Sequence, residues 1–200
     1  FLYTNNKVTP KAPHGLMPRI NTLGTYCLSA AGGSALTSIL FVTHDEIDGV
    51  YGIYPKSLQA PGGDFMVKHT ATETSRLSET SAGKMYVYDD SFEFIGGIVV
   101  ANPACLGRIA NIPSAAVDVT AIEDLMIKLK NKMELGPGTV IYMNEDVMSG
   151  MEIRLKDKGN VSWNPEGGKG LFGEAIPTFR GIPIKKIDSR ILLNSESTVS

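Results

Sequence analysis

Cysteine and histidine are scarce in this sequence, and long apolar runs are missing. The 200 residues include two cysteines and three histidines. Cys27 and Cys105 belong to no C-x-x-C pattern. The sequence is compatible with a disulfide between them, but for a cytoplasmic protein we expect two reduced, buried thiols. No stretch approaches the roughly 20 consecutive apolar residues of a transmembrane helix, which excludes that class of protein.

An excess of positive charge is also missing. The formal net charge is -2 and the isoelectric point is about 5.9, so any contact with nucleic acid is expected to be local or weak. The first residues lack the basic segment and the cleavage site of a signal peptide. Because they also lack an initiator methionine, we expect a fragment, a processed product or the visible part of a longer protein.

The clearest local signals lie between residues 117 and 187. The composition, 42% hydrophobic and 20% charged residues, is that of a soluble globular protein. Residues 120–134 are predicted as a helix, since Thr120 and Glu123 fit a capping box and residues 136–138 (Gly-Pro-Gly) end it. Five apolar residues share one face of this helix: Ile122, Leu125, Met126, Leu129 and Met133.

A strand and a second helix are predicted to follow. Residues 139–143 are apolar and β-prone, as in a central strand that is buried on both faces. Asn144 suits the N-cap of the next helix. Residues 179–187 are predicted as one returning strand, at an edge or kinked because Pro183 has no N–H. The second helix carries four apolar residues: Val147, Met148, Met151 and Leu155.

The first part of the chain is less regular. Residues 1–22 are predicted to be an extended lead-in segment. Residues 22–38 are small and polar, so a flexible loop and a weakly marked helix are both open. Strands are expected at residues 39–42 and 50–54, joined by a hairpin-like turn that ends in Asp-Gly.

The middle of the chain is polar. Residues 56–84 are predicted to be a surface loop or an interaction arm. Residues 85–100 return to a β composition, with a bulge or bend at two glycines. Residues 108–113 then lead into the first helix.

No set of reactive residues converges in the sequence. His44 is followed closely by three acids, Asp45, Glu46 and Asp48, but neighbouring residues of a turn point in different directions. A solvated turn is therefore favoured over a metal site. A catalytic pair can be drawn between either thiol, Cys27 or Cys105, and any of the histidines; small buried thiols are the favoured interpretation. The histidines are His14, His44 and His69.

Glycine-rich and acidic stretches also fail their templates. Residues 136–138 follow a helix instead of a strand, and residues 167–170 (Gly-Gly-Lys-Gly) have no strand before them, so neither predicts a phosphate cradle. Asp89 and Asp90 could form an acid pair, but the simpler interpretation is a polar interruption between two aromatic-rich segments. Three large apolar residues in a polar loop indicate either a partner surface or a satellite of the core: Trp163, Leu171 and Phe172.

Five short segments, in order, resemble one family. Residues 15–21 resemble its G-L-x-x-R-x-N signature, 50–56 its V-x-G-I-x-P-K strand end, and 108–112 its R-I-A-N-I segment. Residues 123–127 are similar to its D-L-M-I helix and residues 178–184 to T-F-R-G-I-P-[VI]. The family is the major capsid proteins of tailed phages, of the epsilon-fifteen-like group. No single motif is specific, but the ordered set covers nearly the whole chain.

The resemblance implies a Hong Kong 97-type shell fold with an axial and a peripheral lobe, assembling into pentamers and hexamers. It also implies that the family's N-terminal arm, extended loop and spine helix precede Phe1. Two departures put loop contacts in doubt. The family's D-A-G-L becomes Ile-Gly-Gly-Ile at residues 95–98, and the loop at residues 163–173 has no counterpart.

We therefore interpret the chain as a structural shell subunit with a mixed α/β (α+β) fold and no catalytic, cofactor-binding or metal site. Residues 1–112 are expected to be mostly peripheral-type and residues 113–200 an axial-type lobe, within one continuous unit. The alternatives are a small α/β enzyme with a cysteine nucleophile, which an acidic thiol would favour, and an independent binding module.

The resemblance also implies the partners and the place of the protein. Its main partner would be itself, in capsomers of a virion assembled in the bacterial host cytoplasm. Further partners would be scaffolding or decoration proteins. Contact with packaged DNA would be weak and non-specific, and no membrane would be bound.

Overall fold

The structure, a computed structural model, describes residues 2–8, 12–54, 67–71, 76–80, 83–87, 90–114, 118–155, 163–164 and 178–200. By its internal contacts the chain divides into two compact units. The larger unit combines Phe1–Tyr51 with Val99–Ser200, and the smaller unit is Gly52–Ile98. In the described part of the chain, the helices are too short or too polar to cross a bilayer.

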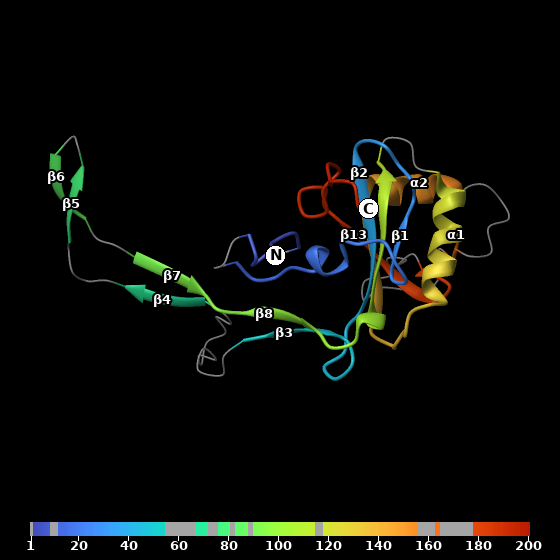
Figure 1. Cartoon of the computed structure of the whole chain (residues 1–200), viewed down its shortest axis with the longest axis horizontal. Helices are drawn as coiled ribbons and strands as arrows, with labels where there is room; N and C mark the ends of the chain where they lie inside the picture. Colours follow the sequence, from blue (N-terminus) through green and yellow to red (C-terminus); the bar gives the residue numbers. More distant parts are fainter. Residues whose placement is uncertain are drawn as a thin grey trace. The chain divides into compact units, whose positions relative to one another are not determined.

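The larger unit is built on one mixed sheet (Figure 1). Seven described strands lie in the order β1-β9-β2-β10-β13-β12-β11. β1 runs parallel to β9 and β10 runs parallel to β13, while the other neighbours are antiparallel. The strands are β1 Cys27–Ser29, β2 Leu36–Thr43, β9 Leu106–Pro113, β10 Thr139–Asn144, β11 Trp163–Asn164, β12 Thr178–Phe179 and β13 Ile182–Ile187.

Two helices cover one face of this sheet, and the N-terminal and C-terminal segments lie on the other (Figure 1). The helices are α1 (Val119–Lys130) and α2 (Glu145–Leu155); short 3-10 helices span Met17–Ile20 and Pro103–Cys105. Side chains alternate along a strand, so every second residue of β2, β9 and β10 meets the helices. The main core contains, among others, Ile39, Phe41, Ile109, Ile141, Met143, Met126, Leu129, Val147 and Met151.

The apolar face predicted for the first helix is confirmed, but the predicted first and last residues of the helix are wrong. Asp118, not Thr120, is the N-cap, since its carboxylate accepts the backbone N–H of Ala121 at 3.3 Å. The capping-box prediction was therefore wrong, and α1 ends at Lys130 instead of continuing to residue 134. Of the predicted face, Leu125 is only half-buried, while four residues are buried: Ile122, Met126, Leu129 and Met133.

The central position of β10 and the cap of α2 are confirmed. Asn144 Oδ1 accepts the N–H of Asp146 at 2.9 Å, and its amide donates to the backbone oxygen of Leu192 at 2.5 Å. β10 lies between β2 and β13. Burial on both faces was wrong, however, because Val140 and Tyr142 face away from the helices and are only half-buried.

The single returning strand predicted for residues 179–187 is a hairpin instead. Arg180 and Gly181 connect β12 to β13, with φ angles of 49° and 85°. Positive φ at both positions is what a two-residue type I′ turn needs. β13 is not an edge strand, since it lies between β10 and β12. Pro183 is tolerated there because the pairing with β10 begins only at Ile184.

Other predictions also failed because strand pairing overrode local composition. The strands around residues 44–49 do not form a hairpin: β2 pairs with β9 and β10, while β3 (Val50–Ile53) pairs with β8 (Gly97–Val100). The segment 22–38 contains β1 and the start of β2. Residues 108–113, predicted to lead into the helix, belong to β9, a buried strand.

The described part of the smaller unit contains two-stranded ribbons. β4 (Val67–Ala71) pairs with β7 (Asp90–Phe94), and β5 (Arg76–Thr80) pairs with β6 (Gly83–Val87). Part of the predicted surface loop at 56–84 is therefore β-structure. The β composition expected for residues 85–100 is confirmed in β6, β7 and β8.

The sheet draws strands from both sides of residue 112. β1, β2 and β9 come before the helices in sequence, and β10 to β13 come after the first of them. The boundary between the two compact units also lies elsewhere, because it separates Gly52–Ile98 from the rest of the chain. The assignment of peripheral-type and axial-type lobes to residues 1–112 and 113–200 stays a prediction.

Leu129 offers a sharp test of the core. Its side chain is fully buried and lies over Gly107, where an added Cβ would be 3.1 Å from Leu129 Cδ2. We expect Leu129→Ala to lower the free energy of unfolding by about 2–5 kcal/mol, since it leaves a cavity. Lys128→Ala, at an exposed position of the same helix, should cost under about 0.5 kcal/mol. Equal losses in urea titrations would contradict the packing of α1.

Candidate functional site

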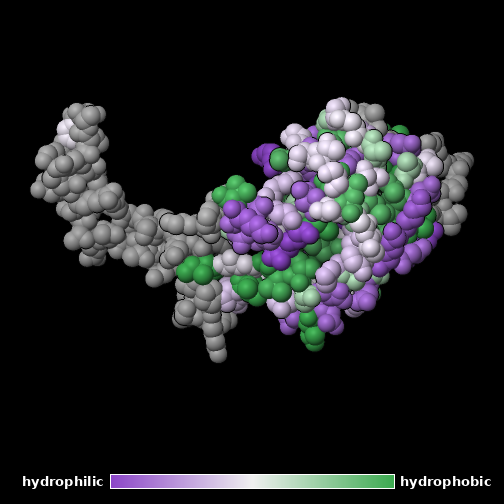
Figure 2. Space-filling model, in the orientation of Figure 1, coloured by the Kyte–Doolittle hydropathy of each residue, from purple (hydrophilic) through white to green (hydrophobic). Residues whose placement is uncertain are grey.

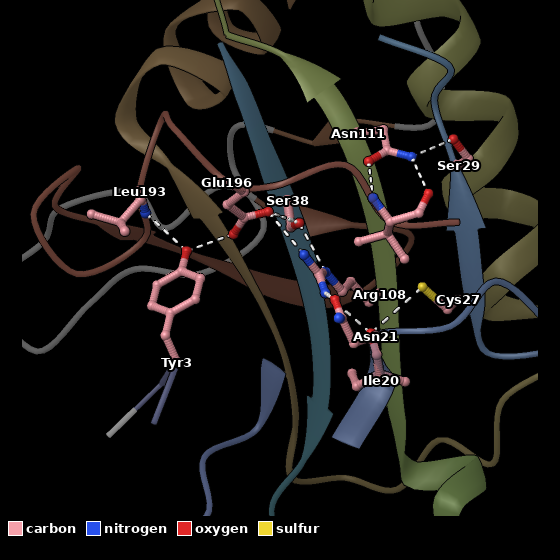
Figure 3. A network of polar contacts seen from close by, with 11 residues as sticks. Tyr3, Ile20, Asn21, Cys27, Ser29, Ser38, Arg108, Asn111, Leu193 and Glu196 are labelled. Carbon is pink, nitrogen blue, oxygen red and sulfur yellow. Dashed lines mark hydrogen bonds and ion pairs between the residues drawn. The ribbon is translucent and has the colours of Figure 1, made fainter. Parts of the chain in front are cut away.

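A buried polar network surrounds Arg108 of β9, within the larger unit (Figure 3). The arginine donates from Nε to Ser38 Oγ at 2.9 Å and from Nη2 to Glu196 Oε2 at 3.0 Å. Its Nη1 donates to the backbone oxygen of Ile20 at 3.1 Å and to Asn21 Oδ1 at 3.2 Å. One side chain thereby joins β9, β2, the N-terminal segment and the C-terminal tail.

Glu196 holds the C-terminal tail in the same network. Beside the arginine, its Oε2 accepts the Ser38 hydroxyl, and its Oε1 accepts the Tyr3 hydroxyl at 2.5 Å. The Tyr3 oxygen in turn accepts the backbone N–H of Leu193 at 3.0 Å. The backbone N–H of Glu196 donates to the oxygen of Leu36 at 2.9 Å, so the tail also pairs with the start of β2.

Burial sets the electrostatics of this network. The side chains of Arg108 and Glu196 are each 3% exposed. Removing two charges from water is costly, and here the cost is offset by their mutual attraction and by the surrounding hydrogen bonds. Burial, and after it the hydrogen bond to Glu196, raises the pKa of Tyr3 above its ordinary value. Tyr3 therefore stays protonated and keeps donating to the carboxylate.

Asn111 makes a second anchor for the tail. It has a φ of 59° next to a register shift between β2 and β9, so it belongs to a β-bulge. Asparagine tolerates this left-handed conformation better than most residues do. Its amide donates to Ser29 Oγ and to the oxygen of Val199, and its Oδ1 accepts the N–H of Val199, each at 2.9 Å. The bulge thus aims the amide at the tail.

This geometry is suited to holding segments together. Within the network, the positive charge of Arg108 is neutralised by Glu196, and the hydroxyls of Tyr3 and Ser38 are hydrogen-bonded to the same carboxylate. A cavity of about 460 Å³ lies beside it, lined among others by Tyr3, Asn21 and Arg108. The network itself presents no activated nucleophile to that cavity.

The histidines expected in turns and loops are placed as follows. His44 Nε2 is 2.9 Å from the Tyr142 hydroxyl, and the two rings meet edge to face. His14 lies half-buried in the N-terminal segment, and its buried Nδ1 has no hydrogen-bond partner among the described residues. Only the backbone of His69, in β4, is described. Among the described residues, no three His, Cys, Asp or Glu side chains are close enough to hold a metal ion.

Both thiols are free and buried, as expected. Cys27 Sγ lies 3.7 Å from the oxygen of Ile20, and Cys105 Sγ lies 3.5 Å from the oxygen of Glu134. Burial raises the pKa of both thiols, and for Cys105 the Glu134 carboxylate raises it further. A nucleophilic cysteine needs the opposite shift, so the thiols give no support to the enzyme alternative.

The remaining sequence candidates fall partly outside the described residues. Asp89, residues 167–170, Leu171 and Phe172 lie outside them, and for Asp90 and Trp163 only the backbone is described. Gly136–Gly138 form a tight turn before β10. An added Cβ at Gly138 would lie 2.2 Å from the backbone oxygen of His44, so only glycine fits there.

Sequence reasoning missed the network, although one signal pointed to it. Arg108 and Asn111 interrupt an otherwise apolar β-prone segment, and a charge within a buried strand has to be paired. The partner, Glu196, could not be found in that way. It lies in the polar C-terminal stretch, 88 positions from Arg108.

Comparison with known proteins decides the family. A family model described as major capsid protein GP7 matches residues 1–200. The chain belongs to this family. A solved chain from a cryo-EM structure of bacteriophage epsilon15 superposes with a TM-score of 0.58 at 21% sequence identity, covering 99% of this chain and 61% of that one. No curated protein matches the sequence.

The similarity to the bacteriophage epsilon15 chain supports the Hong Kong 97-type fold that the sequence resemblance implied. This GP7-family chain spans less than two thirds of the length of that solved chain. The R-I-A-N-I segment that carried the resemblance contains both anchors of the network. Arg108 and Asn111 fix the two ends of this chain to its sheet.

Glu196→Ala tests the network directly. It leaves the Arg108 charge buried without a counter-ion, so we expect the free energy of unfolding to fall by about 3–5 kcal/mol. Asp188→Ala is the matched control, because it removes one partner of the exposed Asp188–Arg190 ion pair and should give no measurable loss. Urea titrations of the two variants measure the difference. Similar effects would show that the buried pair does not hold the chain ends.

Thiol reactivity tests the cysteine alternative. Because burial raises the pKa of Cys27 and Cys105, we expect both to react with an alkylating reagent at neutral pH at least about tenfold more slowly in the folded protein than in urea. Mass spectrometry of the labelled peptides follows each site. Fast reaction of either thiol in the folded protein would instead favour a catalytic cysteine.

Proposed function

We propose that the chain is part of a shell subunit, whose copies associate in pentamers and hexamers and enclose the genome of a tailed bacteriophage or prophage. The main support is the family match over all 200 residues. The fold similarity to a chain of bacteriophage epsilon15 over 99% of this chain adds to it.

The geometry of the larger unit suits this role. A shell subunit has to keep its shape while neighbours pull on its segments. Here both chain ends are attached to the central sheet by a buried ion pair and a bulged asparagine. Such buried, fully paired groups favour one arrangement of the ends over others.

The role is structural in this proposal, without a catalytic residue, cofactor or metal. The raised pKa values of the two thiols support it, as does the neutralised charge of the network. Scaffolding or decoration proteins would be further partners. Contact with packaged DNA would be weak, given the net charge of -2. Assembly would take place in the bacterial host cytoplasm.

Assembly of the full-length protein tests the proposal. Light scattering and electron microscopy should detect capsomers or closed particles at micromolar concentration. The polar segment around residues 56–84 and the residues around Trp163, which the sequence placed in a loop and the structure places in β11, should exchange amide hydrogens more slowly once assembled. A full-length protein that stays monomeric under all assembly conditions, with both segments exchanging freely, would leave the independent binding module as the better account.

A further inference from the structure

The N-terminal segment, residues 2–21, carries no acidic side chain. Its charged residues are all basic: Lys7, Lys11 and Arg19. The segment nevertheless lies against Arg108, which donates from Nη1 to the backbone oxygen of Ile20 and to Asn21 Oδ1. Figure 2 shows hydrophilic atoms, in purple, on the visible surface where Figure 1 places this segment. A basic segment therefore covers a buried positive charge.

The C-terminal tail, residues 193–200, supplies the negative charge that this segment lacks. Glu196 Oε2 accepts from Arg108 Nη2 at 3.0 Å, and each of the two side chains is 3% exposed. Closing a segment over an arginine removes its charge from water, which is costly unless a counter-ion is already in place. The carboxylate of Glu196 is therefore needed before the N-terminal segment can close over Arg108 (Figure 3).

The tail is attached to the sheet by contacts that do not involve the N-terminal segment. The backbone N–H of Glu196 donates to the oxygen of Leu36 in β2. The backbone of Val199 donates to and accepts from the side chain of Asn111 in β9. Two residues of the sheet also pack with Val199 in a small apolar cluster: Cys27 and Ala110. The tail can therefore dock on the sheet while the N-terminal segment is still open.

The N-terminal segment, in contrast, depends on the tail. The Tyr3 hydroxyl donates to Glu196 Oε1 at 2.5 Å and accepts the backbone N–H of Leu193 at 3.0 Å, so both bonds lead to the tail. Within the segment, the backbone of residues 2–4 pairs with that of residues 15–17. A two-stranded pairing of this length is at most marginally stable by itself. The segment therefore needs a docked tail to hold its shape.

We propose that the two ends of the chain dock in a fixed order, the C-terminal tail first and the N-terminal segment second. Tyr3 and Glu196 are 193 positions apart, so the segment that is synthesised first is fixed last. Any event that displaces the tail also opens the N-terminal segment, whereas the tail stays docked when the N-terminal segment opens. This conformational device goes beyond the proposed function and does not depend on it.

Hydrogen exchange in variants of the full chain tests the order. Glu196→Gln combined with Val199→Pro frees the tail, because the pair of changes removes the buried counter-ion and a backbone N–H that bonds to the sheet. The glutamine amide still offers an oxygen to the Tyr3 hydroxyl, so this contact of the N-terminal segment is not deleted. Residues 2–5 and 15–21 should exchange at least about tenfold faster than in the parent and approach the rates of an unstructured chain.

Tyr3→Asp opens the other end. A carboxylate facing Glu196 is repelled, so the N-terminal segment leaves its place. The backbone amides of Glu196 and Val199 should nevertheless exchange at least about tenfold more slowly than in an unstructured chain. Val8→Asp is the matched control, because Val8 lies in the same segment and is 79% exposed. Its exchange should equal that of the parent.

Slow exchange in α1 and β10 shows that each variant is folded, since both elements contribute to the main core. If the double variant loses this protection, Glu196→Gln alone takes its place, with the same expected gain in exchange of residues 2–5 and 15–21. An N-terminal segment that stays protected in these variants would overturn the order of docking. A tail that exchanges freely in Tyr3→Asp would overturn it as well. Both results leave the proposed shell function intact.

Discussion

The buried ion pair between Arg108 and Glu196 is the interaction on which the arrangement of both chain ends depends. The two side chains are each 3% exposed, so removing either partner would leave a buried charge without its counter-ion. Around it the tail supplies Glu196 and the N-terminal segment supplies Tyr3 and the oxygen of Ile20. The sheet becomes a three-layer body, with helices on one face and the two terminal segments on the other.

The second anchor shows how an irregularity of the sheet serves the same end. A regular β9 would point position 111 toward one face or the other in strict alternation. The bulge at Asn111 breaks that alternation and lets the amide bond Val199 on the tail. Val199 then packs with Cys27 and Ala110 in a small apolar cluster. Polar and apolar contacts thus fix the same few residues.

The smaller unit follows a different physical rule. Its described ribbons pair their backbones but have few strands over which to share apolar surface. β3 and β8, where the chain passes between the two units, contain no charged residue.

The sequence by itself determined the elements whose signals are local. The periodicity of residues 122–133 placed the buried face of α1, and Asn144 marked the start of α2. The ordered family motifs indicated a capsid fold. Only the tertiary structure decided β1, the pairing of β9 and the network. Each of these depends on a partner distant in sequence, as Glu196 is from Arg108, and composition around one residue carries no information about such a partner.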